Sequence, residues 1–485
     1  MNKIKEYRKL ANLTQKEVAD KLGITQQAYA AYETTNRVPS GKTLDRLAFI
    51  LNADPNELIS KTILQNSDIT TLEEFLAKSY TSYHTTMNAI SILDRNGFVE
   101  LDMSKKWILK KFCKYYVQIN QSSFIAFKVG DLSEYSFNIA GSHTDSPSLH
   151  IKGNSLIESP EGKRVNVEQY GSLILYSMLD IPLKIAGRVM SKKDNIIESK
   201  IITTDFTVNI PSLCIHHNPT VNKELTLSVQ NDMLPLLGEC DDLYKSIYPE
   251  AEILDADLYC VPDVLPTYSG IDKSLLIAPR IDNLTSVYTS INALINTNNK
   301  GIAVIYASDN EEIGSFTKQG AESVFLENVL KKINQSLNKS EEEFYSAIGN
   351  GFLLSIDNGH AAHPAYLGKS DIDQKVFLNK GIVIKHNVNY STDGVSSSIV
   401  KAICKNNDIE YQDYYNNSDI RCGGTIGLTI STHLAINSCD IGLAELGMHS
   451  AIETVGRSDI AKMEKLIKCF FETTIIKDDN NYQIK

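Results

Sequence analysis

Two adjacent glutamates, Glu311 and Glu312, follow an apolar segment that is typical of a buried strand. This segment, Gly301–Ala307, is rich in β-branched residues and has no alternating polar face. Ligands of α/β proteins bind beyond the carboxyl ends of strands, which is where the pair lies. Because neighbouring side chains of an extended segment point in different directions, one glutamate could hold a metal while the other contacts a water activated by it. For an isolated pair, a solvated strand end is the simpler interpretation.

A His-x-Asp sequence stands at a second position of the same kind. His143 and Asp145 follow the strand-like segment Tyr135–Ala140. Residues two apart on an extended segment face the same side, so the imidazole could bind a metal while the carboxylate orients its ligands. Such a pair occurs often by chance and becomes informative only with further ligands.

Three more residues complete a metal-binding set. Asp282 lies at a strand-to-helix junction, Asp357 ends another apolar strand, and His449 precedes a predicted helix with Glu453 near its start. Asp282 alone would be an ordinary helix cap, yet its two oxygens could also bridge two cations. Two histidines and three carboxylates form a mixed nitrogen and oxygen set that suits a pair of zinc ions, with manganese or cobalt as alternatives. A further carboxylate is left over to act as a general base.

Length and composition limit the kind of protein that positions these residues. A chain of 485 residues exceeds the usual single domain, and 42% apolar with 22% charged residues is typical of a globular protein. The eight cysteines are scattered without a Cys-x-x-Cys pair, so the sequence indicates neither a zinc ribbon nor a disulfide framework. The sequence begins Met-Asn-Lys-Ile-Lys-Glu and has no run long enough to cross a membrane, so we predict a cytoplasmic protein without a membrane partner.

The first sixty residues differ from the rest in charge and pattern. Residues 1–61 hold ten Lys or Arg and seven Asp or Glu, a net charge of +3, so the remainder carries −14. The pattern predicts short helices at 4–11, 15–22, 26–32 and 43–51. Thr14 and Glu17 form a predicted capping box, and Gly23 ends the second helix before a tight turn. Helix, short turn and helix is the helix-turn-helix pattern.

This segment resembles the phage-repressor-like helix-turn-helix family. The resemblance places four residues at the start or exposed face of the recognition helix: Thr25, Gln26, Gln27 and Tyr29. Glutamine can bond adenine edges in the major groove, so residues 1–62 are predicted to bind DNA. A net charge of +3 is low for a DNA-binding domain, and a small helical bundle for protein contacts or self-association is the open alternative.

The remainder of the chain resembles the M18 metallo-aminopeptidases, relatives of aspartyl aminopeptidase and vacuolar aminopeptidase I. The similarity runs from about Leu72 to the C-terminus. It rests on the order and spacing of six stretches: Gly141–Pro147, Arg280–Leu284, Asp309–Ser315, Ser355–Pro364, Cys422–Gly427 and Gly447–Ser450.

The resemblance implies five ligands for two zinc ions: His143 and Asp357 on one, Glu312 and His449 on the other, and Asp282 between them. Glu311 is then the general base, and Asp145 orients His143. Coordination of the free α-amino group of a peptide by one zinc would restrict cleavage to its N-terminus.

The implied fold class is α/β: an all-α helix-turn-helix domain, then a mixed-sheet peptidase domain interrupted by a β-rich assembly domain. The expected boundaries are 1–62 for the first domain, 63–72 for a linker, 73–152 and 267–485 for the catalytic domain, and 153–266 for the insert. Three apolar runs of the insert are candidate strands: Ile181–Val189, Ile196–Phe206 and Leu225–Val229. Relatives form a dodecamer in which a neighbour's histidine enters the active site, and His216 matches that position.

Three further residues are implied to lie on the substrate side of the centre: Lys385, His360 and Tyr390. Lys385 could favour an N-terminal Asp or Glu by a charged contact. The chain departs from the family nearby, with Asn389 in place of a basic residue and Ala365 in place of asparagine, and substrate specificity therefore stays open. A peptide- or metal-sensing transcriptional regulator with a little-active peptidase body is the alternative function.

Overall fold

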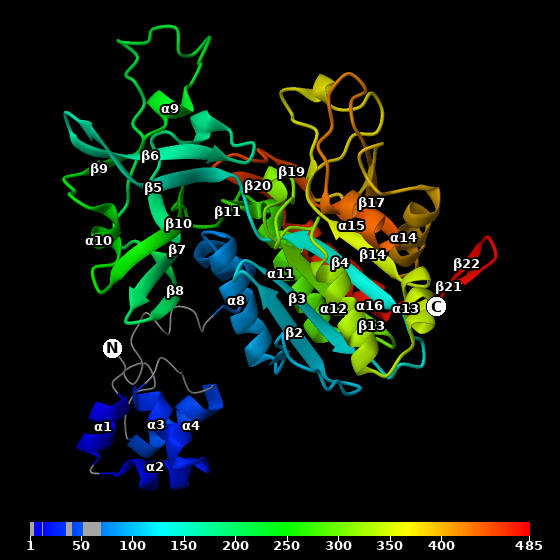
Figure 1. The fold of residues 1–485 in the computed structure, drawn as a ribbon. Helices are drawn as coiled ribbons and strands as arrows, with labels where there is room; N and C mark the ends of the chain where they lie inside the picture. Colours follow the sequence, from blue (N-terminus) through cyan, green and yellow to red (C-terminus); the bar gives the residue numbers. More distant parts are fainter. Residues whose placement is uncertain (1–3, 12, 35–40, 52–68) are drawn as a thin grey trace. The chain divides into compact units, whose positions relative to one another are not determined.

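The structure is a computed structural model that describes residues 4–11, 13–34, 41–51 and 69–485 (Figure 1). The chain divides into two compact units, one of Met1–Thr71 with Ile90–Gly97 and one of Leu72–Ala89 with Phe98–Lys485. Most of the predicted linker at 63–72 and the end of the predicted first domain lie outside the described residues; helix α7 begins at Leu72.

The N-terminal unit contains the predicted short helices: α1 (Ile4–Leu10), α2 (Gln15–Leu22), α3 (Gln26–Thr34) and α4 (Gly41–Leu51). Thr14 and Glu17 form the capping box reciprocally at the start of α2. Gly23 ends that helix at φ 74°, a left-handed conformation that glycine adopts without strain. The fold predicted for this unit is confirmed.

Tyr29 corrects one prediction about the recognition helix. Its side chain is fully buried and belongs to the core that Val18 and Leu47 also form. The aromatic ring fills the space between the helices, because a bundle this small has few large apolar side chains with which to build a core. The expectation that Tyr29 lies on the exposed face is therefore wrong. The other three residues of that set are exposed: Thr25, Gln26 and Gln27.

A mixed sheet forms the centre of the larger unit within residues 69–485. Its nine strands are, in spatial order, β1 (Val99–Glu100), β2 (Lys114–Ile119), β3 (Ser123–Val129), β13 (Ile302–Ser308), β4 (Phe137–His143), β14 (Phe352–Ile356), β18 (Asn437–Gly442), β16 (Ile382–His386) and β17 (Tyr411–Tyr415). The pairs β13–β4, β4–β14 and β14–β18 are parallel. Three adjacent parallel strands, β13, β4 and β14, therefore end at the same edge of the sheet.

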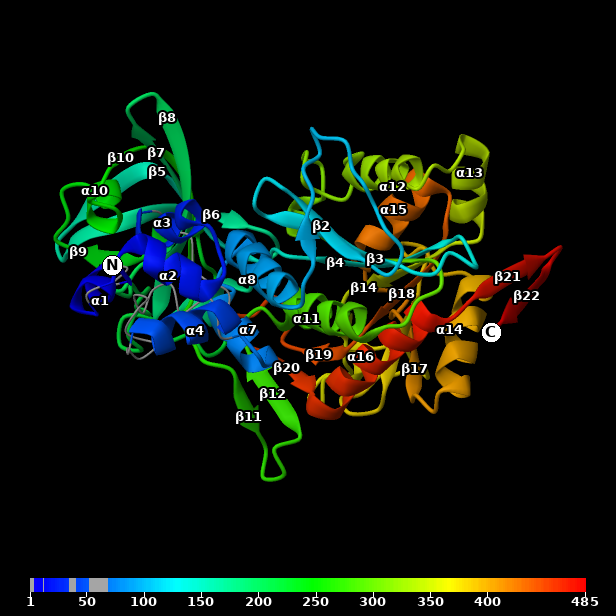
Figure 2. The ribbon, with the colours of Figure 1, turned by 90° about the horizontal axis from the view of Figure 1, so that it is seen from below.

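Helices cover both faces of this sheet (Figure 2). One face carries α12 (Phe325–Ser336), α13 (Glu341–Gly349) and α15 (Ile426–Leu434), whose apolar side chains join those of β2, β3, β4 and β13 in one core. The other face carries α11 (Ile281–Asn296), α14 (Gly394–Asn406) and α16 (Arg457–Glu472). The strands are buried on both sides, which explains why Ile302–Ser308 is apolar throughout.

A second, antiparallel sheet of six strands in the described residues forms the β-rich insert. Its order is β8 (Ile196–Thr203), β7 (Leu183–Lys193), β10 (Glu252–Pro262), β5 (Ser148–Ser159), β6 (Gly162–Tyr170) and β9 (Leu236–Gly238). The run Leu225–Val229 is not a strand, because it lies in a turn-rich connection that ends in the short helix α9 (Val229–Asp232). The insert also contains the 3-10 turn η1 (Leu175–Met178) and α10 (Leu243–Ile247).

The described residues also form two smaller sheets. One has the order β11 (Thr267–Ser269), β12 (Leu275–Ala278), β20 (Glu453–Gly456), β19 (Ala444–Leu446) and β15 (Gly359–His360). The other pairs β21 (Ile475–Asp478) with β22 (Asn481–Ile484). The remaining elements are α7 (Leu72–Lys78), α8 (Ser82–Arg95), η2 (Glu311–Ile313) and η3 (Leu367–Lys369). No described helix has both the length and the apolar character needed to cross a membrane.

Candidate metal centre

The candidate site lies where β4, β13 and β14 end. Pairing sets Ser308 of β13 beside His143 of β4, and Ser355 of β14 beside Gly141. His143 is the last residue of its strand, and the next polar residues of the other two strands follow within a few positions. The expectation that the chemistry gathers at strand ends therefore has a direct basis in the register of the sheet.

Asp282 lies at the middle of the candidate ligands, buried at the start of α11. Its Oδ1 lies 3.5 Å from Nε2 of His143, and its Oδ2 lies 3.6 Å from Nε2 of His449. Nε2 of His143 is also 3.7 Å from Oδ1 of Asp357, and Nε2 of His449 is 3.5 Å from Oε1 of Glu312. Two ligand groups thus share one carboxylate, each group using a different oxygen of it.

Two carboxylate oxygens indicate that this cluster fits a metal. Oδ1 of Asp282 and Oε1 of Glu312 are buried, and neither has a hydrogen-bond partner within the part of the chain that the structure describes. A buried carboxylate oxygen without a partner is costly unless a cation compensates it. The set of imidazole nitrogens and carboxylate oxygens matches the ligands that zinc prefers.

The pKa shifts of the site also indicate that its carboxylates lack enough positive charge nearby. Burial raises the pKa of Glu312 well above its ordinary value, although His449 offsets part of the shift. Burial alone would lower the pKa of His449, but the carboxylates of Asp282 and Glu312 raise it to about 10. Divalent cations among these groups would lower the pKa of each of them and keep the carboxylates ionised.

Glu311 belongs to a third geometric group, with His143 and Glu312. Its Oε2 lies 4.0 Å from Nε2 of His143. Burial raises the pKa of Glu311 to about 8, His143 opposes this shift, and the charge of Asp357 adds to it. By distance alone, Glu311 could therefore be a ligand or a base.

Asp145 fixes the turn that carries the two glutamates. Its Oδ1 accepts the backbone N–H of Glu311 at 3.1 Å and its Oδ2 accepts that of Glu312 at 3.2 Å. His143 donates from Nδ1 to the backbone carbonyl of Asp145 at 3.0 Å, while the Asp145 carboxylate is 3.5 Å away. The sequence predicted only that Asp145 orients His143. Its hydrogen bonds to the backbone of Glu311 and Glu312 are a further contact that the sequence did not indicate.

Glu453 is a functional candidate for which the sequence predicted the wrong secondary structure. It begins strand β20 instead of lying in a helix, and α16 starts only at Arg457. Its carboxylate accepts the backbone N–H of Asp282 at 3.0 Å and that of His449 at 2.8 Å. Burial raises its pKa to about 8, and the charge of Asp282 adds to this effect. A glutamate four residues after His449 was the one signal available beforehand.

Two of the candidate substrate residues, Lys385 and Tyr390, are in contact, and a third, His360, lies within range of the charge of Lys385. Nζ of Lys385 is buried, 3.5 Å from Oδ2 of Asp357 and 5.2 Å from the ring centre of Tyr390. His360 is exposed at the end of β15. His216 is exposed in the connection between β8 and α9, and its role in a neighbouring subunit stays a prediction.

Two family profiles match the chain. That of the M18 aminopeptidase I zinc metalloproteases matches residues 75–247 and 244–471, and a helix-turn-helix profile matches residues 4–58. A probable M18 family aminopeptidase 2 from Clostridium novyi is 39% identical over 421 residues, which are 82% of this chain and 97% of that protein. Its namesake from Clostridium acetobutylicum is 36% identical over the same shares of both chains.

Two solved structures are similar to this chain over most of its length. The chain is similar to one in the complex of Ape4 and Nbr1, with 30% identity and a TM-score of 0.79 over 82% of this chain and 84% of that one. It is also similar to the S. cerevisiae mApe1 dodecamer, with 25% identity and a TM-score of 0.73 over 82% of this chain and 95% of that one.

Proposed function

We propose, because the chain belongs to the M18 family of zinc metallo-aminopeptidases, that it releases N-terminal amino acids from peptides at a dinuclear zinc centre. The observation that carries this proposal is the position of Asp282, whose two oxygens face His143 and His449 separately. A carboxylate shared in this way is suited to hold two cations side by side.

We assign the ligands by these two groups: His143 and Asp357 with one oxygen of Asp282, and Glu312 and His449 with the other. Bound zinc would polarise the scissile carbonyl, make a water molecule more acidic and offset the negative charge that develops on the carbonyl oxygen. Glu453 and Asp145 hold the backbone of the ligand-bearing segments in place through the hydrogen bonds described above.

Glu311 is assigned the proton transfers. It removes the proton of the attacking water and delivers it to the departing amine. Two features support this role. Asp145 accepts the backbone N–H of Glu311 and so fixes the turn that carries it. The side chain of Glu311 lies beside His143 but shares no possible ligand group with Asp282 among the described residues.

We further propose that Lys385 gives a preference for acidic N-terminal residues. Its support is a buried ammonium group beside Asp357, at the edge of the ligand set. A cation in a site of low polarity makes a strong charge-assisted bond to a carboxylate.

A panel of short peptides tests the activity and the preference together. The zinc-loaded protein is expected to release free N-terminal amino acid, EDTA to abolish the release, and added zinc to restore it. N-terminal Asp and Glu should leave at least about 10-fold faster than Leu, the ratio expected of one charged hydrogen bond. Equal rates would contradict the acidic preference alone. No release from any peptide would contradict the aminopeptidase and favour the sensing regulator.

The remaining proposals concern surroundings and assembly. We propose a cytoplasmic protein, which is supported by its eight cysteines, all of them described and all free. We also propose a homo-oligomer, since one similar structure is that of a dodecamer. In such an assembly, the exposed His216 would be available to a neighbouring subunit.

For the helix-turn-helix unit we propose DNA binding through the exposed start of α3. Support comes from the matched family and from the exposure of Thr25, Gln26 and Gln27. The full-length protein is expected to bind duplexes selected from a random pool, with an affinity that falls steeply as salt increases.

Replacing Gln26 and Gln27 together by alanine should weaken binding to the selected duplex by about 10-fold or more, since each bidentate base contact is worth 1–3 kcal/mol. Fluorescence anisotropy at several salt concentrations measures this. Gln335→Ala on α12, an exposed glutamine outside the N-terminal unit, is the matched control and should have no effect. Unchanged affinity of the double variant would exclude base contacts by these residues.

A further inference from the structure

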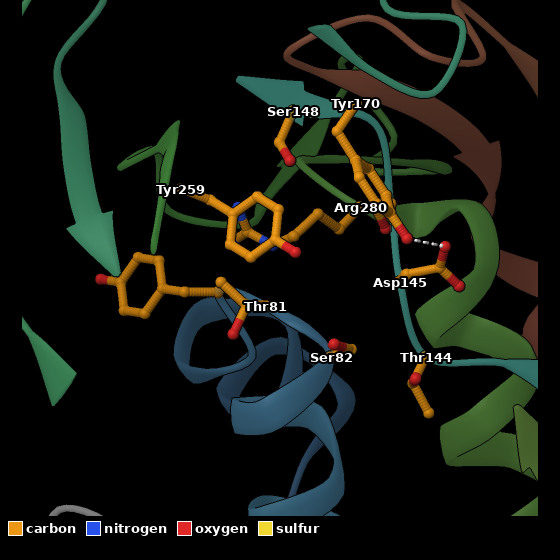
Figure 3. A pocket seen from close by; sticks show the side chains of 10 residues that line it. Thr81, Ser82, Thr144, Asp145, Ser148, Tyr170, Tyr259 and Arg280 are labelled. Atoms are coloured by element: carbon orange, nitrogen blue, oxygen red, sulfur yellow. Dashed lines mark hydrogen bonds between the residues drawn. The ribbon is translucent and has the colours of Figure 1, made fainter. Parts of the chain in front are cut away.

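Strand β6 of the insert ends beside the turn that carries Glu311 and Glu312. The hydroxyl of Tyr170, its last residue, donates to Oδ2 of Asp145 at 2.7 Å (Figure 3). The same hydroxyl accepts a hydrogen bond from Nδ2 of Asn310 at 2.9 Å. Asp145 and Asn310 lie on two different segments that meet at Glu311 and Glu312, so one phenol joins both.

Asn310 is itself a constrained residue. It has φ 63°, in the left-handed region, and directly precedes the glutamate pair. Its Oδ1 accepts bonds from Thr317 Oγ1 and Gln319 Nε2, both at 2.8 Å. With its Nδ2 on Tyr170, both the oxygen and the nitrogen of the side-chain amide are engaged, which holds the unusual backbone conformation in place.

The next two residues of the insert, Gly171 and Ser172, lie beside two of the candidate metal ligands. A Cβ on Gly171, at φ 72°, would lie 3.0 Å from the Cβ of Glu312, so a larger residue here would be strained and would crowd this ligand. The carbonyl of Ser172 accepts a bond from Nδ1 of His449 at 3.1 Å. Nδ1 is thereby the protonated nitrogen, and Nε2 remains available to a metal.

We propose that Tyr170 is a positioning residue for the reaction, which fixes the Glu311–Glu312 turn through Asp145 and Asn310. The insert thus completes the catalytic centre, in addition to any part it has in assembly. This inference rests on the roles proposed above for Glu311 and Glu312. Without the hydroxyl, Asp145 loses a charge-assisted bond and the Asn310 amide loses an acceptor, so the turn gains freedom.

Tyr259 on β10 provides a matched control. Its ring packs edge-on against that of Tyr170, with centroids 5.6 Å apart, and both line the same pocket (Figure 3). Within the described part of the chain, no hydrogen bond is found for the Tyr259 hydroxyl. Tyr170→Phe and Tyr259→Phe therefore remove the same atom from neighbouring rings, and only the first removes contacts to the turn.

The test compares both variants with the wild-type chain on a peptide that the wild type cleaves. Tyr170→Phe should lower kcat by about 10- to 100-fold, the usual cost of losing an outer hydrogen-bond partner, with KM changed less than about threefold. Tyr259→Phe should leave both unchanged. In cobalt-substituted protein, the ligand-field absorption should shift in Tyr170→Phe and not in Tyr259→Phe, because Glu312 lies on the affected turn.

Thermal unfolding of each variant separates positioning from folding. A Tyr170→Phe protein with normal kcat and an unshifted cobalt spectrum would overturn the inference. So would one whose activity falls only in proportion to a lost folded fraction, or a Tyr259→Phe protein that is equally impaired. A wild-type chain inactive on every peptide, by contrast, contradicts the proposed function itself.

Discussion

Glu311→Gln is expected to lower kcat by about 100- to 10,000-fold while the protein keeps its zinc, because the amide cannot accept the proton of the attacking water. The size of the effect is that of general-base catalysis. KM should change little, since the amide fills the same space. Steady-state kinetics and elemental analysis of zinc on the same sample measure both quantities.

The zinc content decides between the two roles that geometry allows for Glu311. This residue forms one possible ligand group with His143 and Glu312, as well as being the proposed base. Loss of a zinc ion from Glu311→Gln would contradict the base assignment and make it a ligand. Glu312→Ala is the comparison, since it should lose both the metal that it shares with His449 and the activity.

Asp282→Asn is expected to lose zinc from both positions and to lower activity by more than about 100-fold, which exceeds the cost of disturbing a residue outside the ligand set. Each oxygen of Asp282 faces a different histidine, and an amide offers only one oxygen and no charge. The variant keeps the shape of the side chain, so a large change in folding is not expected. Zinc analysis and a zinc-titrated activity assay test this.

Asp459→Asn is the control that distinguishes the loss of a bridging carboxylate from the loss of any buried aspartate. Asp459 is fully buried at the start of α16, where its Oδ1 accepts the backbone N–H of Gly381 at 2.9 Å. This control should lower the unfolding temperature without releasing zinc. If Asp282→Asn retained a full complement of zinc, the shared-carboxylate arrangement would be wrong.

These expected outcomes bear on the two activities that are proposed for this chain. The peptidase prediction depends on residues within the larger unit, whereas DNA binding depends on the start of α3 in the smaller one. Substitutions at Glu311 or Asp282 should therefore leave the binding of DNA unaffected. A coupled loss of both would indicate regulation of one activity by the other.

The sequence alone determined the family and the fold class, and it predicted the candidate ligands that the structure brings together. This was possible because the signals are local: apolar strands such as Ile302–Ser308 end in carboxylates, and a capping box and Gly23 define α2. Strand ends that meet at one edge of a parallel sheet bring such residues together whatever their separation in the chain. The motif order then identified the family.

Only the tertiary structure decided how the side chains meet. Sheet order sets β13 between β3 and β4, and this arrangement directs the carboxylate of Asp145 to the amides of the glutamate turn. Burial of Tyr29 depends on which face of α3 packs, and the strand β20 at Glu453 depends on a partner strand far away in the sequence. The contact of Tyr170 with Asn310 joins the sheet of the insert to the segment that follows β13 of the central sheet. Each of these depends on contacts between distant segments, which leave no periodic pattern in the local sequence.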